Sequence, residues 1–303
     1  MVAFSSLVNP RPESGGYFSE FLLEKCIGEG SWSTVFSASQ LDDEERTVKY
    51  AVKFAKLNLD QIAKEIEIYE YLRTQTDKCK FAPEFYWGCL NEEIPALITS
   101  LEGPSFATVA KQCPGGKVDA GLLVRLARHS VVAYMKLHEH NILHVDVSPK
   151  KLLLRGVHSA DSLLVVIADF SQAHISSDED GNRIPCTKLM MSPFTSWPAS
   201  RGLGYEECDD LQSLAHCLLQ IAGFFQFDGI PSSKSRTMRQ KLFEDSEHVF
   251  RSRSNKLFFD LFGKIFDLEK GDEIDYMAIF KAIKNHPLYD RKEDFNTLTA
   301  KFS

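Results

Sequence analysis

The stretch that decides the fold is residues 144–151, which read His-Val-Asp-Val-Ser-Pro-Lys-Lys. A short apolar run follows at residues 163–167 and ends in Ala-Asp-Phe-Ser at residues 168–171. The pattern places Asp146 and Asp169 on loops at the ends of strands or helices. Phosphoryl transfer uses such a pair of carboxylates, because one orients the attacking hydroxyl and the other holds a magnesium ion. The stretch therefore indicates a phosphotransfer site.

The composition favours a folded, globular protein and argues against nucleic-acid-binding and membrane-spanning classes. The chain has 303 residues, and 44% of them are hydrophobic, which is enough for a sizeable core. A net charge of −7 and the lack of a basic block argue against a nucleic-acid partner. Apolar runs are too short to span a membrane, and seven scattered cysteines without a C-x-x-C pair are typical of free thiols in a reducing compartment. We expect no membrane partner and a cytoplasmic or nuclear location.

A second group of polar residues comes earlier in the chain. Residues 27–36 place Gly28 and Gly30 between two apolar runs, and such a turn lets backbone N–H groups approach phosphates. The same glycines also suit a plain hairpin. Lys53 lies within an apolar strand at residues 50–54, where an ammonium needs a partner. The expected partner is Glu65, beside the apolar stripe of a helix at residues 59–72; a solvated helix acid is the alternative.

The element pattern predicts an α+β chain. Strands at residues 85–88 and 96–99 complete a small lobe of five strands and one helix. Beyond residue 103 the pattern turns helical, at residues 122–138, 209–221, 255–266 and 275–283, with a polar helix–loop surface at residues 231–254. We predict a loose leader (1–20), one domain (21–291) and a tail (292–303). Within the domain we expect an N-lobe (21–99), a hinge (100–103) and a mainly helical C-lobe (104–291).

With these elements in place, the chain resembles the eukaryotic protein kinases over roughly residues 20–288. Their H-R-D-x-x-x-x-N and D-F-G motifs correspond to residues 144–151 and 169–171 here. Within that superfamily the chain is most similar to the casein kinase one group, through Leu-Glu-Gly-Pro-Ser at residues 101–105 and Asp-Asp-Leu-Gln-Ser-Leu at residues 209–214. The resemblance implies a bilobal protein-kinase-like fold, ATP and Mg²⁺ as cofactors, a protein substrate or binding partner, and a monomeric domain.

The resemblance also implies roles for single residues. Asp146 would be the catalytic base, Asp169 the magnesium ligand, and Lys53, oriented by Glu65, would hold the α- and β-phosphates. The residues that it implies for ATP binding are Ile27, Gly28, Gly30, Val35, Ala51, Lys53, Thr99, Leu101 and Leu153.

The catalytic loop departs from the family pattern. Ser148 replaces a lysine, Lys151 replaces the asparagine that binds a second metal ion, and Ser171 replaces the last glycine of D-F-G. An ammonium has no acceptor lone pair and cannot ligate a cation. If Lys151 points into the site, it takes over part of that metal's work and turnover is slow; if it points to solvent, transfer is near background. Lys150 is the other lysine that could reach the phosphates.

Two function classes stay open from the sequence. The first is a serine/threonine protein kinase of casein kinase one type with reduced activity. The second is a pseudokinase that acts as a nucleotide-binding, scaffold or allosteric module.

Overall fold

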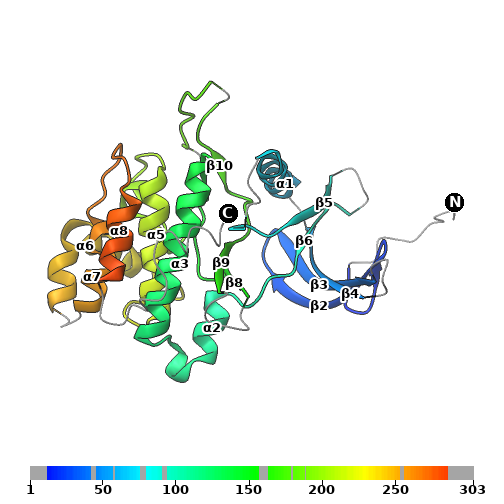
Figure 1. Ribbon diagram of the computed structural model, residues 1–303, viewed down its shortest axis with the longest axis horizontal. Coiled ribbons are helices and arrows are strands. Elements are labelled where there is room, and N and C mark those ends of the chain that lie inside the picture. The colour runs from blue at the N-terminus through cyan, green and yellow to red at the C-terminus, as the bar shows by residue number, and fades with distance from the viewer. Residues whose placement is uncertain are drawn as a thin grey trace. The chain divides into compact units, whose positions relative to one another are not determined.

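The computed structural model of the chain describes residues 12–41, 46–56, 59–75, 80–90, 94–156, 163–178, 180–187, 189–252 and 256–285. These residues form two compact units (Figure 1). Unit 1 comprises the described residues within 1–74 and 83–102, and unit 2 those within 75–82 and 103–303.

Unit 1 is an antiparallel sheet with one helix. The sheet has the strand order β1-β2-β3-β4-β6-β5. Its strands are β1 (Tyr17–Phe18), β2 (Phe21–Glu29), β3 (Ser33–Leu41), β4 (Thr47–Ala55), β5 (Phe85–Cys89) and β6 (Ala96–Ser100). The helix is α1 (Leu59–Thr74), which contacts β5 and β6.

The sheet of unit 1 differs from the predicted one in two ways. It has six strands rather than five, because β1 lies in the segment that we predicted to be a loose leader. The Phe18 ring packs edge-on against Phe54, 5.0 Å away, and the Gly15 N–H donates to the Leu23 carbonyl at 2.7 Å. A strand of two residues is too short for side-chain periodicity to reveal it. Residues 1–11 of the predicted leader lie outside the described residues.

The alternation of β4 separates the core from a second face. Val52 and Phe54 are buried in the hydrophobic core of unit 1, together with Leu23, Phe36 and Ile98. Because successive side chains of a strand point to opposite faces, Ala51 and Lys53 project away from this core. The β4 register therefore decides which face carries the lysine.

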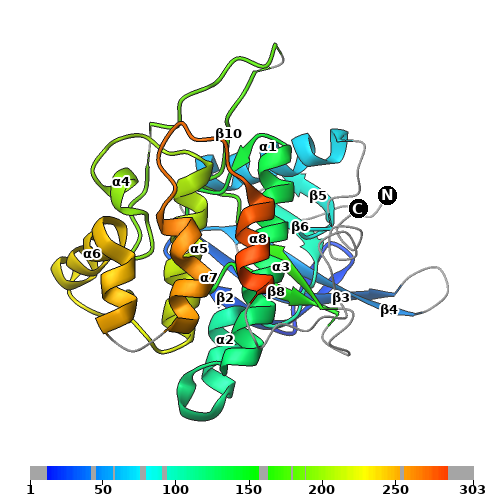
Figure 2. The same ribbon diagram turned by 60° about the vertical axis from the view of Figure 1, so that its left-hand side comes forward.

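Unit 2 is mainly helical (Figures 1 and 2). Its helices are α2 (Phe106–Gln112), the 3₁₀ turn η1 (Pro114–Gly116), α3 (Ala120–Glu139), α4 (Trp197–Ser200), α5 (Glu207–Ile221), α6 (Ser232–Ser252), α7 (Lys256–Phe266) and α8 (Tyr276–Lys284). Buried residues cover almost all of α5, and α3 and α7 pack against it. The long helices predicted from the sequence are thus present. In the described part of the chain, no helix combines the length and apolar character needed to cross a membrane.

Two short strand pairs of unit 2 flank the loops that carry Asp146 and Asp169. Strand β7 (Ile142–Leu143) pairs with β10 (His174–Ile175), and β8 (Leu152–Arg155) pairs with β9 (Leu164–Ile167).

The predicted N-lobe range needs a correction, since residues 80–82 belong to unit 2. The reason is that the Phe81 carbonyl accepts from the Ile167 N–H at 2.7 Å and the Phe81 ring stacks on His140.

Candidate active site

The lysine of β4 forms the expected ion pair within unit 1. Lys53 Nζ lies 2.5 Å from Glu65 Oε2, and only 14% and 3% of the two side chains are exposed. Both charges are therefore largely removed from water, and each satisfies the other. Glu65 faces the lysine as predicted, and the alternative of a solvated helix acid is wrong.

The predicted ATP-binding residues of the sheet share one face. Val35 of β3 pairs with Lys53, and Ala51 of β4 pairs with Thr99 of β6. Directly paired residues of antiparallel strands project to the same side. These four side chains therefore lie on the face opposite the core of Val52 and Phe54.

The hairpin glycines have no structural need to be glycine. Neither Gly28 nor Gly30 has a positive φ, and a Cβ at Gly28 would meet Val35 at an ordinary 3.5 Å. Ile27 beside them is 48% exposed. The fold alone thus does not explain these glycines, whereas the close approach of a ligand to the backbone would.

The catalytic-loop lysine of unit 2 joins the two predicted acids. Asp146 lies between β7 and β8, and Asp169 follows β9. Lys151 donates a hydrogen bond to Asp146 Oδ2, and its Nζ lies 2.9 Å from Asp169 Oδ2. Its side chain is 15% exposed. Lys151 therefore points into the site, which is the first of the two orientations considered from the sequence.

Two opposing effects set the pKa of Lys151. Burial by itself lowers the pKa of this ammonium, but the attraction of Asp169 and Asp146 outweighs burial and holds the pKa above its ordinary value. Lys151 is therefore cationic at neutral pH. Two carboxylates and one ammonium leave a single net negative charge at this position.

Asp210 of α5 holds the backbone of the catalytic loop. Its buried carboxylate accepts from the N–H groups of His144 at 2.7 Å and Val145 at 3.0 Å, and from the Tyr205 hydroxyl at 2.8 Å. Val145 has a φ of 71°, which is costly for a β-branched residue. The two hydrogen bonds to one carboxylate stabilise this conformation and place Asp146 directly after it.

The same loop is tied to the Asp169 loop through His144. Its ring packs against Phe170 at 5.7 Å, and its Nε2 lies 3.2 Å from the Ala168 carbonyl oxygen. Both side chains are fully buried. His144 is thus a packed core residue of unit 2. Asp169 itself has a φ of 67°. Asp146 therefore follows a strained residue and Asp169 is one, and the contacts around the two loops hold these backbone conformations.

The remaining predicted residues differ in exposure. Lys150 is exposed, in contrast to its neighbour Lys151. Leu153 of β8 is half-buried and bridges to Ser105. Leu101, at the end of unit 1, is half-buried.

The residues around the acids fit at most one divalent cation. Among the residues that the structure describes, no group of three or more His, Cys, Asp or Glu side chains could hold a metal ion. Asp169 supplies carboxylate oxygens, as Mg²⁺ prefers, but the second metal-binding position of the family pattern holds an ammonium. A second divalent cation therefore does not fit.

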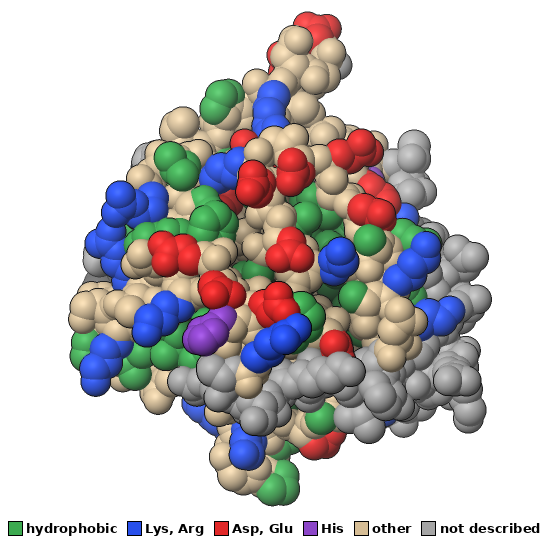
Figure 3. Space-filling view, turned by 90° about the vertical axis from the view of Figure 1, so that its left-hand side faces the viewer, with side chains coloured by type: hydrophobic (Ala, Val, Ile, Leu, Met, Phe, Trp, Pro, Cys, Tyr) green, Lys and Arg blue, Asp and Glu red, His purple; other side chains and the backbone are tan. Residues whose placement is uncertain are grey.

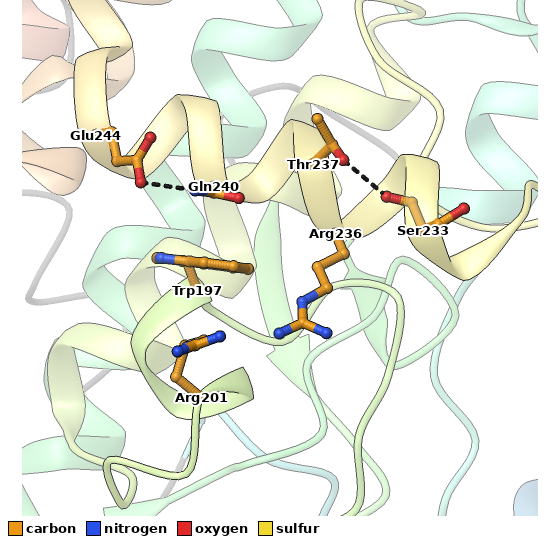
Figure 4. Close-up of a pocket in the computed structure, with 7 residues that line it drawn as sticks. All are labelled: Trp197, Arg201, Ser233, Arg236, Thr237, Gln240 and Glu244. Atoms are coloured by element: carbon orange, nitrogen blue, oxygen red, sulfur yellow. Dashed lines mark hydrogen bonds between the residues drawn. The ribbon is translucent and has the colours of Figure 1, made fainter.

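Sequence reasoning missed a polar pocket on unit 2, about 570 Å³ in volume (Figure 4). The guanidinium groups of Arg201 and Arg236 lie 5.6 and 5.5 Å from the ring centroid of Trp197. Figure 4 shows both groups on the same side of the indole ring. These residues come from α4, the residue after it and α6, and no sequence motif links them. Elsewhere, acidic and basic side chains lie interspersed across the face in Figure 3.

Known proteins with similar sequences are protein kinases. The chain is 22% identical over 289 residues to casein kinase I homolog RAG8 of Kluyveromyces lactis, covering 93% of this chain and 50% of that protein. It is 23% identical over 261 residues to casein kinase I homolog 2 of Schizosaccharomyces pombe, covering 82% and 58%. The chain thus spans about half the length of the curated relatives it matches. No protein-family model matches the chain.

A solved structure shows the same fold. Vaccinia related kinase 3 matches with a TM-score of 0.66 at 14% sequence identity, over 92% of this chain and 91% of that one. This likeness confirms the predicted α+β fold of protein-kinase type.

Proposed function

We propose that this chain, which belongs to the protein-kinase superfamily, is a serine/threonine protein kinase of casein kinase one type with reduced activity. It would transfer the γ-phosphate of ATP to a hydroxyl of a protein substrate. The observation that carries the proposal is the buried ion pair between Lys53 and Glu65. A buried ion pair adds little to stability compared with apolar side chains of similar volume. Its presence supports a use for the ammonium, which is to bind phosphate oxygens.

The acids of unit 2 support the transfer step. Asp146 would orient the substrate hydroxyl and accept its proton while the new oxygen–phosphorus bond forms and the bond to the ADP oxygen breaks. The Lys151 ammonium would stabilise the negative charge that develops on the transferred group. Asp169 would hold a magnesium ion, which would supply positive charge beside the triphosphate.

The contact between Lys151 and Asp146 supports the reduced activity that we propose. The ammonium donates to Asp146 Oδ2 and so competes with the substrate hydroxyl for the same carboxylate. One cation in place of two also provides less charge for the phosphates. We therefore propose slow but measurable turnover.

The same contact favours a second candidate function. A pseudokinase would bind nucleotide, or hold the Lys53–Glu65 pair as a structural feature, and act as a scaffold or allosteric partner. The engagement of Asp146 by Lys151 supports this alternative, because a carboxylate that already accepts from an ammonium is less available to a substrate hydroxyl. In either case we propose a monomeric domain that acts on or binds another protein in the cytoplasm or nucleus.

Transfer of labelled phosphate separates the two functions. The purified chain is incubated with γ-labelled ATP, magnesium or manganese, and serine- and threonine-containing protein substrates. Asp146→Asn is the inactive control, and Lys111→Asn, on the exposed end of α2, is the matched surface control. We expect transfer by the wild type and by Lys111→Asn, and a loss of roughly a hundredfold or more in Asp146→Asn. Wild-type transfer no greater than that of Asp146→Asn, with ATP still raising the melting temperature, would identify the pseudokinase.

A further inference from the structure

The position of Lys151 bears on how ATP is neutralised. In the family pattern two carboxylates lie at the transfer site, and two divalent cations, held by the D-F-G aspartate and the catalytic-loop asparagine, neutralise the charge of the triphosphate. Here the Lys151 ammonium already contacts both carboxylates, through a hydrogen bond to Asp146 and a distance of 2.9 Å to Asp169 Oδ2. The negative charge that would repel a metal-free triphosphate is therefore halved.

The backbone of Lys151 is held in place as well as its side chain. Its N–H donates to the Ser148 carbonyl at 3.0 Å, and its carbonyl accepts from the Ala168 N–H at 2.9 Å. These bonds attach Lys151 to its own loop and to the residue directly before Asp169. The ammonium thus has a defined position between the acids rather than freedom to sample solvent.

A second divalent cation finds no oxygen ligand from residue 151 and meets a like charge at this position. Lysine offers three donors and no acceptor, so the oxygen ligand of the family pattern is missing. A cation that approached Asp146 and Asp169 would also be repelled by the positive charge of the Lys151 ammonium. Both effects act in the same direction, against a metal ion at the place that Lys151 occupies.

We propose that the Lys151 ammonium takes the place of the second divalent cation, and that this chain consequently binds ATP without divalent metal. The inference rests on the proposed nucleotide binding. It concerns the binding step alone: ATP binds equally with and without magnesium, and the magnesium ion that Asp169 would hold acts in the transfer step. The opposite behaviour, in which the ammonium moves aside and a metal ion is required, gives a different result in the same experiment.

Calorimetric titration of the full chain with ATP tests the proposal, in excess EDTA and in excess magnesium chloride. We expect the two dissociation constants of the wild type to agree within about threefold. Lys151→Asn restores an oxygen ligand and removes the charge, and Lys151→Gln removes the charge with a longer side chain. In both variants we expect binding in EDTA to weaken by about tenfold or more relative to binding in magnesium. Lys111→Asn, the same substitution on the surface, should behave as the wild type.

Each outcome has a defined meaning. Wild-type binding that weakens about tenfold or more in EDTA overturns the inference and leaves the proposed kinase function intact. Variants that keep the wild-type ratio also overturn it, since Lys151 would then not be the cation responsible. If neither variant folds by circular dichroism, the wild-type comparison decides by itself. No ATP binding in either buffer overturns the proposed nucleotide binding instead.

Discussion

Lys53 of β4 and Glu65 of α1 form a buried ion pair with a distance of 2.5 Å between Nζ and Oε2. The pair joins the strand to the helix within unit 1. Desolvation makes each charge costly unless its partner is present. The two residues are therefore coupled energetically, whatever ligand the lysine binds.

Removing one partner should cost more than removing both. Lys53→Met leaves the Glu65 carboxylate buried and unpaired, and we expect it to lower the free energy of unfolding by about 3 kcal/mol. Lys53→Met combined with Glu65→Leu should recover about half or more of that loss. Urea denaturation of the wild type, both single variants and the double variant measures the coupling. Additive losses in the double variant would show that the pair is not coupled in the folded chain.

Asp210 should be a major determinant of loop stability. Asp210→Asn replaces one acceptor oxygen with an NH₂ group. This donor would face the backbone N–H of either His144 or Val145, so that one hydrogen bond to the catalytic loop is lost. We expect a loss of about 3 kcal/mol in the free energy of unfolding. Asp180→Asn makes the same change at an exposed position and should change stability by less than about 0.5 kcal/mol. Equal effects of the two substitutions would contradict the role given to Asp210.

Acidification should destabilise the fold through His216 of α5. This side chain is fully buried, its Nδ1–H donates to the Phe194 carbonyl at 2.9 Å, and its Nε2 has no hydrogen-bond partner among the described residues. Burial lowers the pKa of His216 to about 3, and Arg239 acts in the same direction. The unfolded chain therefore takes up a proton below about pH 6.5 that the folded chain does not. Stability is then lost as the pH falls from about 6.5 towards 3.

The histidine contribution can be isolated by substitution. Between pH 7 and pH 5, His216 should account for a loss of roughly 2 kcal/mol in the free energy of unfolding. His216→Gln should remove that part of the pH dependence, whatever its own cost at pH 7. The exposed His248 offers a control, since His248→Gln should keep the wild-type slope. Denaturant unfolding at both pH values is the measurement, and an unchanged slope in His216→Gln would refute the assignment.

Gly88 allows α1 to pack closely on β5. A Cβ at this position would lie 2.7 Å from Ile66 Cγ1 and 2.8 Å from Ile66 Cδ1. We therefore expect Gly88→Ala to cost about 2 kcal/mol through overpacking. The same substitution in an Ile66→Ala background should cost less than half as much, because the conflicting atoms are gone. A cost that does not depend on residue 66 would place the strain elsewhere.

Much of this protein could be predicted from its sequence alone. The order of Lys53, Glu65, Asp146 and Asp169, with apolar runs around them, is local information that periodicity and residue type express directly. The pairing of Lys53 with Glu65 also followed, because a lysine in an apolar strand needs a buried partner. The α+β fold class and the long helices of unit 2 rest on the same kind of pattern.

Tertiary structure alone decided the direction of Lys151. A lysine side chain has several rotatable bonds and can reach solvent or a buried site from the same backbone. Two carboxylates, delivered by separate loops, determine the outcome here by attracting the ammonium to both. The short strand β1 and the Arg201–Trp197–Arg236 arrangement are further examples, since both depend on residues that meet only after folding. The sequence by itself thus determined which charged groups the chain carries and on which elements, whereas long-range packing and electrostatics decided which of them meet.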